Sequence, residues 1–450
     1  MEILRLSEIA QACGGSCNTD CDIKGVCIDT RKVTEGCLFI CIKGERFDGH
    51  QFVQEALDKG AAAVMVHSDI DADCAYVRVA DTSKALLDLS GYYRSKFDIP
   101  VVGLTGSVGK TTTKEFTYLV VHSKYNAIKT LGNLNNEIGL PQMLFQLDNT
   151  TQAAVIEMGM NHFGEIHNLT MAAKPTLALI TNIGVSHIEN LGSREGILKA
   201  KLEIIDGLKK GSTIILNGDN DLLSTVKDDD YNIIFYGVDN GDFRADNITE
   251  ENGSTTFTVK HFNETQSITI PTIGIHNVYN ALAAFAVGYY LDIDSEKCAK
   301  ALSSYQPEGM RQKSVSFNGI TCIEDCYNAS PDSMRAGITT LANTEGKRKI
   351  AVLSDMLELG DYARQAHLEV GAMAAESKID YLLAFGNDSK YIIQGALDNG
   401  LKNAHHFDSK EALTDKLMDI IEKDDTILFK ASRGMKLEDV IHNVYDRWGK

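Results

Sequence analysis

A chain of 450 residues is long enough for about three domains of ~150 residues each. Its formal net charge of −18 argues against nucleic acid or an anionic membrane surface as the main partner. No apolar run approaches the ~20 residues that span a bilayer, and no signal-like apolar segment follows Met1. We therefore expect a cytoplasmic protein with no nucleic-acid partner and no membrane insertion.

The first hundred residues mix predicted strands at 26–29, 37–42 and 61–67 with a predicted amphipathic helix at 52–59. A turn at Asp29-Thr30-Arg31 follows the first strand. Spacing alone favours a turn with a solvated arginine. A cation and hydroxyls beside a Gly-rich loop could equally hold a diphosphate. Residues 98–100 are predicted to be the first linker.

The ten cysteines include pairs four residues apart, such as Cys37/Cys41 and Cys322/Cys326. A zinc site is possible, but the chain has no C-x-x-C pair and no nearby H-x₃₋₅-H. Cys37 and Cys41 lie in an apolar strand that would bury them. We therefore expect reduced, structural thiols.

Residues 101–114, VVGLTGSVGKTTTK, carry the strongest motif of the chain. An apolar run that predicts a strand ends in a turn with Gly106 and Gly109, and Lys110 and Thr111 follow at the start of a predicted helix. Backbone N–H groups, a helix N-terminus and a lysine suit phosphates, and the hydroxyl suits Mg²⁺. The alternative is a glycine turn before a surface lysine. The spacing T-G-x-x-G-K-T also departs from the usual G-x-x-x-x-G-K-[ST].

From the first linker to about residue 304, predicted strands and helices alternate, as in a parallel sheet. Strands are predicted at 153–157, 177–181 and 213–216, and 255–270 is predicted to be a β-rich insertion with Asn252-Gly253 as a turn. Glu157 ends one strand and His187 follows another, where ligands of open α/β sheets bind. Taken singly, each is more often a structural polar group. Together with the glycine loop, they favour a metal held by phosphate oxygens.

Residues 305–309 are predicted to be a second linker. Beyond it, strands at 350–353, 381–385 and 426–429 alternate with helical spans such as 364–376, which predicts a small parallel α/β domain. This part carries no G-x-G-x-x-G, so a dinucleotide site is not expected.

With these motifs in view, the whole chain resembles the Mur ligases, whose folylpolyglutamate synthetase relatives share the T-G-x-x-G-K-T loop. Further matching strings are GNLNNEIG at 132–139, HNVYNALAA at 276–284, DCYNASPDSM at 325–334 and SDMLELG at 354–360. Three positions depart mildly, since the family usually has serine at Thr30, asparagine at Ser330 and glycine at Ala431. None of these changes removes a charged group.

The resemblance implies three α/β domains: a small UDP-muramoyl-peptide-binding domain at 1–98, a central P-loop, parallel-sheet ATPase domain at 99–306, and a Rossmann-like C-terminal domain at 307–450. It implies an ATP site made of Gly106, Ser107, Val108, Gly109, Lys110, Thr111, Thr112, Asn136, Asn277, Asn280, Arg311 and Asp325. It implies substrate contacts from Thr30, Arg31, Asp48, His50, Asn328, Asp355, Lys430, Ser432 and Arg433.

Two Mg²⁺ ions are also implied, held by Thr111, Glu157, His187 and a carbamylated lysine, with Lys110, Lys201 and His187 as the catalytic residues. Carbamylation by CO₂ turns a cation into the anionic oxygen ligand that Mg²⁺ prefers. Lys199 and Lys201 compete for this role. The family spacing A-K-x-E-I matches 200–204 and favours Lys201, whereas without the resemblance a surface lysine would be preferred.

The implied reaction uses ATP to convert a carboxylate into an acyl phosphate, which an amine then attacks. The strings of the last third resemble those of family members that add D-Ala-D-Ala to UDP-MurNAc-tripeptide. One alternative is the sibling that adds the third amino acid, although its arginine-containing D-x-x-R-type motif is not found here. Another is a P-loop ATPase that couples hydrolysis to motion. We expect a monomer that binds these small molecules.

Overall fold

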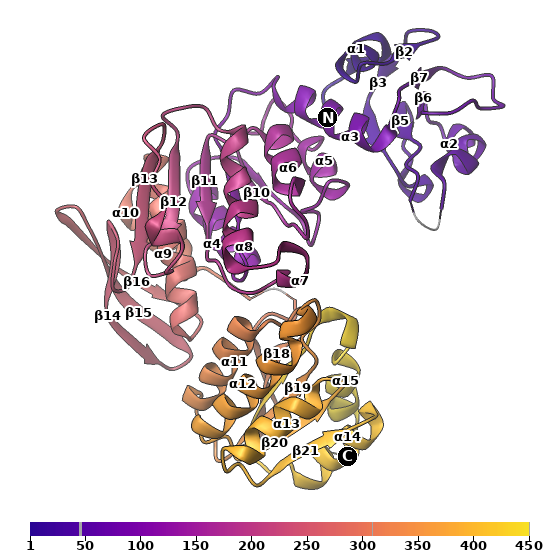
Figure 1. The fold of residues 1–450 in the computed structure, drawn as a ribbon. Helices are drawn as coiled ribbons and strands as arrows, with labels where there is room; N and C mark the ends of the chain where they lie inside the picture. Colours follow the sequence, from indigo (N-terminus) through magenta and orange to yellow (C-terminus); the bar gives the residue numbers. More distant parts are fainter. Residues whose placement is uncertain (45–46, 308, 450) are drawn as a thin grey trace.

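The computed structural model describes residues 1–44, 47–307 and 309–449. The chain forms three α/β units, with the central unit in contact with the other two (Figure 1). Three main sheets belong to separate stretches of sequence, and the expected domain boundaries after residues 98 and 306 fall between these sheets. Glu308, part of the second predicted linker, lies outside the described residues.

The first unit is a five-stranded sheet in the order β2-β7-β6-β5-β4, parallel except for the pair β2–β7. Its strands are β2 (Ser16–Cys17), β4 (Gly25–Cys27), β5 (Cys37–Ile40), β6 (Ala63–Val66) and β7 (Tyr76–Arg78), and β1 (Leu4–Arg5) pairs with β3 (Asp22–Ile23). Its helices are α1 (Leu6–Ala12), α2 (Val53–Asp58) and α3 (Thr82–Arg94). Cys37 and Cys41 are buried, as the apolar pattern predicts.

Helix α3 joins this unit to the next. Gly91 packs so closely on α6 that a Cβ there would lie 3.3 Å from Ala172 Cα. The buried Arg94 guanidinium donates hydrogen bonds to the carbonyls of Ala173 (3.0 Å), Phe97 (2.5 Å) and Ile99 (3.2 Å). Burial lowers the pKa of Arg94. These bonds tie the predicted first linker to the central unit.

The central unit is a nine-stranded sheet in the order β16-β15-β14-β13-β12-β11-β8-β10-β9. The strands are β8 (Val101–Thr105), β9 (Ala127–Lys129), β10 (Ala153–Glu157), β11 (Leu177–Ile180), β12 (Thr213–Asn217), β13 (Asn232–Gly237), β14 (Phe243–Glu251), β15 (Ser254–His261) and β16 (Glu264–Ile270). Pairing is parallel from β9 to β14, and β14–β16 form an antiparallel extension. The predicted turn at Asn252-Gly253 joins β14 to β15.

Alternate residues of the central strands face two layers of helices. Val102 and Leu104 of β8 pack with α4 (Lys110–His122), α9 (Ile275–Tyr290) and α10 (Ser295–Ser303). Val101 belongs to the opposite core with α5 (Gly139–Leu144), α6 (Glu165–Ala173) and α8 (Arg194–Leu202). The short helix α7 (Ile188–Leu191) precedes α8. Because both faces are covered, strands at the middle of the sheet such as β8, β10 and β11 are mostly apolar.

The third unit is a six-stranded sheet in the order β17-β18-β22-β19-β20-β21, parallel except for β17. Its strands are β17 (Lys313–Phe317), β18 (Ile320–Asp325), β19 (Lys349–Ser354), β20 (Tyr381–Phe385), β21 (Ala404–Phe407) and β22 (Thr426–Lys430). Its helices are α11 (Pro331–Asn343), α12 (Ala363–Glu376), α13 (Ser389–Asp398), α14 (Lys410–Ile420) and α15 (Glu438–Arg447).

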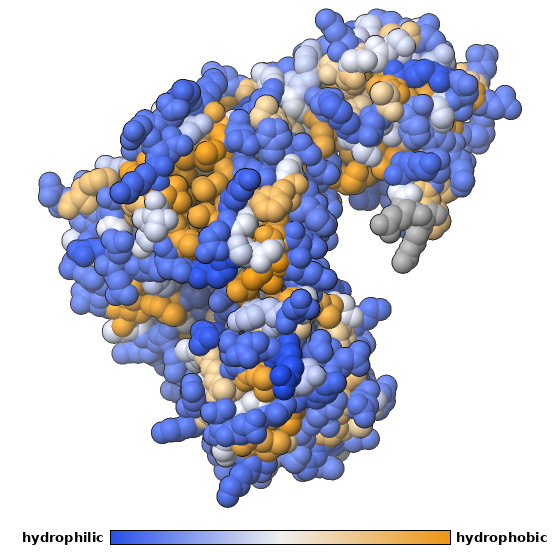
Figure 2. Space-filling model, viewed as in Figure 1, coloured by the Kyte–Doolittle hydropathy of each residue, from blue (hydrophilic) through white to orange (hydrophobic). Residues whose placement is uncertain are grey.

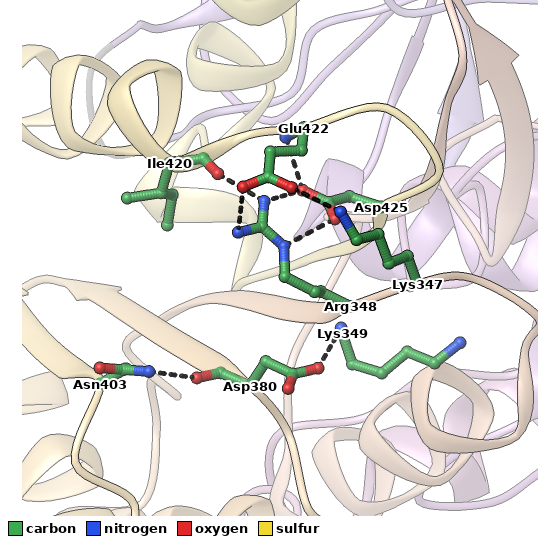
Figure 3. Close-up of polar contacts among 8 residues, drawn as sticks. All are labelled: Lys347, Arg348, Lys349, Asp380, Asn403, Ile420, Glu422 and Asp425. Carbon is green, nitrogen blue, oxygen red and sulfur yellow. Dashed lines mark hydrogen bonds and ion pairs between the residues drawn. The ribbon is translucent and has the colours of Figure 1, made fainter.

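An ion-pair cluster fixes the amino ends of β19 and β22 (Figure 3). The Arg348 guanidinium donates two hydrogen bonds to Asp425, at 2.9 and 2.6 Å, and one to the Ile420 carbonyl at 2.6 Å. Glu422 accepts a further bond from Arg348 at 3.0 Å and pairs with Lys347. The cluster lies at the end of this sheet opposite to Asp325 and Lys430.

The structure confirms the α/β class and the predicted alternation of strands and helices. Predicted strands at 153–157 and 381–385 coincide with β10 and β20, and most others differ by one or two residues at an end. Within the described part of the chain, no helix combines the length and the apolar character needed to cross a membrane.

Candidate active site

The glycine loop follows β8 at the middle of the central sheet, where the chain order changes direction and ligands of open α/β sheets bind. Gly106 has φ +155° and Gly109 has φ +79°, and α4 begins at Lys110. A Cβ on Gly106 would lie 1.8 Å from Thr181 Oγ1, so only glycine fits this approach. The loop therefore presents a strand, a tight turn and a helix start, as the motif predicts.

Asn182, at the end of β11, holds this loop. Its Oδ1 accepts hydrogen bonds from the backbone N–H groups of Ser107 (3.1 Å) and Val108 (2.9 Å). Thr181 Oγ1 donates to the Val108 carbonyl at 2.7 Å. On the other side, Asn280 of α9 accepts a bond from Thr113 Oγ1 at 3.0 Å. These contacts fix the loop between two elements distant in sequence.

Lys110 folds back over its own loop. Its Nζ donates to the carbonyl of Gly106 at 2.8 Å and reaches that of Ser107 at 3.4 Å. Burial lowers the pKa of Lys110, nearby Glu157 raises it, and Arg311 lowers it further. A desolvated cation beside a helix N-terminus is suited to a polyanion such as the phosphates of a nucleotide.

Thr111 and Glu157 form a polar pair at the start of α4. Thr111 Oγ1 donates to Glu157 Oε2 at 3.0 Å, and Asn135 Nδ2 donates to Oε1 at 2.9 Å. Lys114 Nζ lies 3.7 Å from Oε2, and both charged groups are buried. A hydroxyl and a carboxylate side by side form an oxygen donor set that fits Mg²⁺.

His187 and Lys201 have different surroundings. His187 has φ +64°, and its Nδ1 lies 2.8 Å from Glu358 Oε2 of the third unit, as an ion pair without hydrogen-bond alignment. Lys201 is 2 % exposed, and no described carboxylate lies within ion-pair distance of its Nζ. Burial and the charge of Lys110 lower its pKa well below the usual range. Lys199 is exposed, with its Nζ 5.8 Å from the ring of Phe163.

A cavity of about 550 Å³ runs between the central and third units. On the third unit's side, Lys430 Nζ donates to Asp325 Oδ2 at 2.5 Å, and the Arg311 guanidinium stacks 3.7 Å from the Tyr327 ring. The predicted site residues that line the cavity are Ser107, Val108, Gly109, Lys110, Thr111, Thr112, Asn136, Glu157, His187, Asn277, Asn280, Arg311, Asp325, Asn328 and Lys430.

The remaining predicted contacts lie elsewhere. Asp355 is buried and accepts hydrogen bonds from the backbone N–H groups of residues 387–389, at 2.7 to 3.1 Å. Ser432 accepts a bond from the Leu357 N–H at 3.0 Å, and Arg433 pairs with Glu438 at 2.8 Å. Gly106 and Lys201 are adjacent to the cavity's lining but not part of it.

In the first unit, the four predicted substrate contacts lie at two places in the chain, 30–31 and 48–50. Arg31 pairs with Asp29 at 2.6 Å and its side chain is 85 % exposed, and Thr30 is the neighbouring residue. Asp48 Oδ1 lies 2.6 Å from His50 Nδ1. These residues leave a cation on the surface, and none of them lines the cavity.

Sequence reasoning missed Asn182, Asn135 and Asp332 as site residues. Asn182 directly follows the predicted strand at 177–181, and Asn135 lies inside the matched string GNLNNEIG, so a signal was present. Their roles depend on hydrogen bonds to residues 75 and 22 positions away, which spacing does not show. Asp332 also lies inside a matched string, DCYNASPDSM, but its P-D-S portion is equally an ordinary helix start.

The fold and the site together define a P-loop enzyme of three α/β units whose nucleotide-type site is completed by its third unit. Family models match residues 22–89 (Mur ligase family, catalytic domain), 104–288 (Mur ligase middle domain) and 310–433 (Mur ligase, glutamate ligase domain). The chain belongs to the Mur ligase family.

Similar proteins match this chain over nearly its full length. The UDP-N-acetylmuramoyl-tripeptide–D-alanyl-D-alanine ligase of Bacillus subtilis is 42 % identical over 94 % of this chain and 93 % of its own. The Escherichia coli enzyme of the same name is 36 % identical over 97 % of both chains. A crystal structure of MurF from Acinetobacter baumannii superposes with a TM-score of 0.95, at 32 % identity, over 99 % of this chain and 100 % of that one. MurF ligase from Thermotoga maritima, in complex with ADP, gives 0.86 at 29 % identity over 94 % and 97 %.

Proposed function

We propose that this chain joins D-alanyl-D-alanine to UDP-N-acetylmuramoyl-tripeptide with ATP, giving the pentapeptide precursor of peptidoglycan. One observation carries the proposal: the phosphate loop and the Asp325–Lys430 pair face one cavity, in a chain similar to such ligases from end to end. A carboxylate is a poor electrophile because amine attack would have to expel oxide. Transfer of a phosphoryl group from ATP makes an acyl phosphate, from which phosphate can leave.

Different groups of residues bind different parts of the substrates. The loop amides and Lys110 bind the β- and γ-phosphates, and Asn280 and Asp325 bind the adenine and ribose. Arg311 binds the γ-phosphate. Thr30, Arg31, Asp48 and His50 hold the UDP group on the first unit. Of the third unit's predicted contacts, Asn328 and Lys430 line the cavity, where the amine must arrive.

Thr111 and Glu157 would hold one Mg²⁺, and His187 with carbamylated Lys201 would hold a second. When bound, these ions neutralise the crowded oxygens of the transferred phosphoryl group. The fit rests on the paired oxygens of Thr111 and Glu157 and on the buried amine of Lys201, whose pKa burial lowers well below its usual range. An unprotonated lysine amine is the form that reacts with CO₂.

Carbamylation can be tested directly. We expect the enzyme in ¹³C-bicarbonate to show a carbamate carbon resonance that disappears in Lys201→Ala and persists in Lys199→Ala. The control removes an exposed lysine two positions away on the same helix. A resonance that survives in Lys201→Ala would exclude this lysine as the site.

The reaction is tested by measuring phosphate release with each amine in turn. Release should need ATP, UDP-MurNAc-tripeptide and D-Ala-D-Ala together. A requirement for a diamino acid instead would indicate the sibling ligase. Phosphate release without any acceptor would indicate a P-loop ATPase and would contradict the proposal.

We further propose that the enzyme acts as a monomer in the cytoplasm. Each function of the site can be met by residues of one chain, and ATP is an intracellular substrate. Light scattering of the purified protein should give the mass of one chain, and twice that mass would contradict the proposal.

A further inference from the structure

Four acidic side chains line the cavity: Glu157, Glu165, Asp325 and Asp332. The first three accept hydrogen bonds from the protein, at 3.0, 2.6 and 2.5 Å respectively. Asp332 differs, because no hydrogen bond or ion pair from any described residue reaches its carboxylate, and its Oδ2 is buried. Its other oxygen, Oδ1, is not buried and also has no partner among the described residues, so the carboxylate calls for one that arrives with a ligand.

Asp332 stands in the first turn of α11 and reaches across the seam to the central unit. A Cβ on Gly184 would lie 2.0 Å from Asp332 Oδ2 and 3.4 Å from Ser107 Cβ. The carboxylate is therefore packed against the main chain at Gly184, next to a residue of the phosphate loop. A group bound to the accessible Oδ1 would be close to the phosphoryl end of a nucleotide held by that loop.

The surroundings leave the carboxylate without a counter-ion in contact. Burial raises the pKa of Asp332, and Arg335 and Arg194 lower it from a distance. Arg194 does not pair with Asp332, because its guanidinium donates hydrogen bonds to Asp221 and to the Ile183 carbonyl instead, at 2.5 to 2.9 Å. A half-buried carboxylate with no partner in contact is costly, and a cationic ligand would offset that cost.

We propose that Asp332 binds the α-ammonium group of the incoming dipeptide and accepts its proton. This inference rests on the proposed function, in which an amine must reach an acyl phosphate beside the loop. An α-amino group has a pKa of about 8, so at neutral pH it arrives mostly as the cation and has no lone pair for attack. A carboxylate at this position both attracts the cation and removes the proton.

The proton and electron balance is complete. One N–H proton passes to Asp332 Oδ1, and the freed lone pair forms the C–N bond at the acyl carbon. The C–O bond to the phosphate breaks and its electron pair leaves with the phosphate. A second N–H proton leaves as part of HPO₄²⁻, and Asp332 returns its proton to solvent when the product departs.

The test compares two nucleophiles in Asp332→Asn. With D-Ala-D-Ala, kcat/KM should fall by about 100-fold or more, the scale of general-base catalysis. Hydroxylamine is largely uncharged at neutral pH and traps the acyl phosphate as a hydroxamate, so its product should form at close to the native rate. Asp398→Asn, which removes an exposed carboxylate at the end of α13, should leave both reactions unchanged.

The pH profile gives a second readout. In Asp332→Asn only the free amine can react, so kcat/KM for the dipeptide should rise about tenfold per pH unit up to a pH of about 8. The native enzyme should show a shallower rise over this range. If the role of Asp332 were merely structural, the variant's pH profile would lie below the native profile but run parallel to it.

Three results would overturn the inference. Asp332→Asn could keep the native rate with D-Ala-D-Ala, or it could lose hydroxamate formation to the same extent as dipeptide ligation. A native enzyme that forms neither product from ATP and UDP-MurNAc-tripeptide would overturn the proposed function, and the inference with it. The native hydroxamate reaction therefore separates the two failures.

Discussion

Three lysines lie near the phosphate loop in different surroundings: Lys110 is half-buried, and Lys114 and Lys201 are buried. Lys110 donates to loop carbonyls, Lys114 lies 3.1 Å from Glu115 and 3.7 Å from Glu157, and Lys201 lacks a carboxylate partner among the described residues. A chain with a net charge of −18 thus concentrates positive charge at one point. Such local focusing allows an acidic protein to bind a triphosphate.

Lys110→Ala should abolish ligation. The loss removes the cation that faces the phosphoryl oxygens, and preorganised charges of this kind contribute roughly 10²–10³-fold each. Since Nζ bonds only to loop carbonyls here, the variant should fold normally. ADP release in the presence of all three substrates measures the effect, with Lys199→Ala as the control. Ligation at native speed in Lys110→Ala would contradict the assigned role of the loop.

The sequence predicts side chains better than it predicts their partners. Lys110, Thr111, Glu157 and His187 follow from a motif and from strand ends, because parallel strands bring their carboxyl ends together. Asn182 could not be predicted in the same way, because its role is to accept hydrogen bonds from two loop amides 74 and 75 residues away. A functional group can be recognised from the sequence when its own type and position indicate its role, but not when its role depends on a contact with a distant residue.

At the scale of elements, apolar runs predict where strands lie, but they do not predict which strands pair at the edge of the sheet. The segment 153–157 is β10. Its first four residues are apolar because the strand is covered on both faces, and Glu157 at its carboxyl end belongs to the site. The β-rich insertion was placed correctly, but its attachment as β14–β16 to the same sheet was not predicted. That attachment depends on parallel pairing of β13 with β14, which local pattern does not encode.

The antiparallel extension contains a buried histidine with a predictable pH response. His261 stacks on Phe243 at 5.2 Å, and both of its ring nitrogens lack hydrogen-bond partners. Burial lowers its pKa from 6.5, and Glu264 opposes this shift. The unfolded chain therefore binds a proton that the folded chain resists, so the stabilising contribution is present above pH 6.5 and is lost as the pH falls below it.

His261→Phe should remove this pH dependence while keeping the aromatic contacts. At pH 5.5 we expect β14–β16 to be more stable in the variant by up to about 1.4 kcal/mol, with little difference at pH 7.5. Hydrogen exchange of peptides from these strands, compared between native and variant at each pH, measures the effect. His162→Asn, at an exposed histidine, is the control. A native-to-variant ratio that does not change with pH would contradict the prediction.

The cluster of Figure 3 should be essential to the stability of the third unit. Arg348→Met leaves Asp425, whose side chain is 0 % exposed, without its cation, and should destabilise by about 3–5 kcal/mol. Lys347→Met removes a 61 % exposed partner of Glu422 and should cost less than about 1 kcal/mol. Trp448, the only tryptophan of the chain, lies in this unit and reports its urea unfolding by fluorescence. Equal midpoints for both variants would contradict the assignment.

At the scale of the whole molecule, the two seams of the central unit differ in kind. The seam with the first unit is part of one apolar core that runs from Leu38 through Leu89 to Leu169. The seam with the third unit holds the cavity and polar contacts such as His187–Glu358 and His276–Gln312, the latter at 2.6 Å. Large apolar interfaces resist motion and polar ones allow it. The third unit is therefore the part free to move.

The space between the first and third units should close when substrates bind. Figure 2 shows these two units apart on one face, and no hydrogen bond or ion pair joins them among the described residues. A substrate anchored at Arg31 has to reach a cavity that Arg31 does not line, and an acyl phosphate exposed to water would hydrolyse. Both demands are met if the third unit rotates about the segment that contains the second linker.

Small-angle X-ray scattering can measure this closure. The radius of gyration should fall when a non-hydrolysable ATP analogue and UDP-MurNAc-tripeptide are both present, and less with either alone. Hydrogen exchange at α3 should not change, because the Arg94 bonds to α6 and the first linker persist if the third unit moves. Deprotection of α3 during closure would show that the first unit moves instead. An unchanged radius with both ligands would show that the open arrangement is already the reactive one.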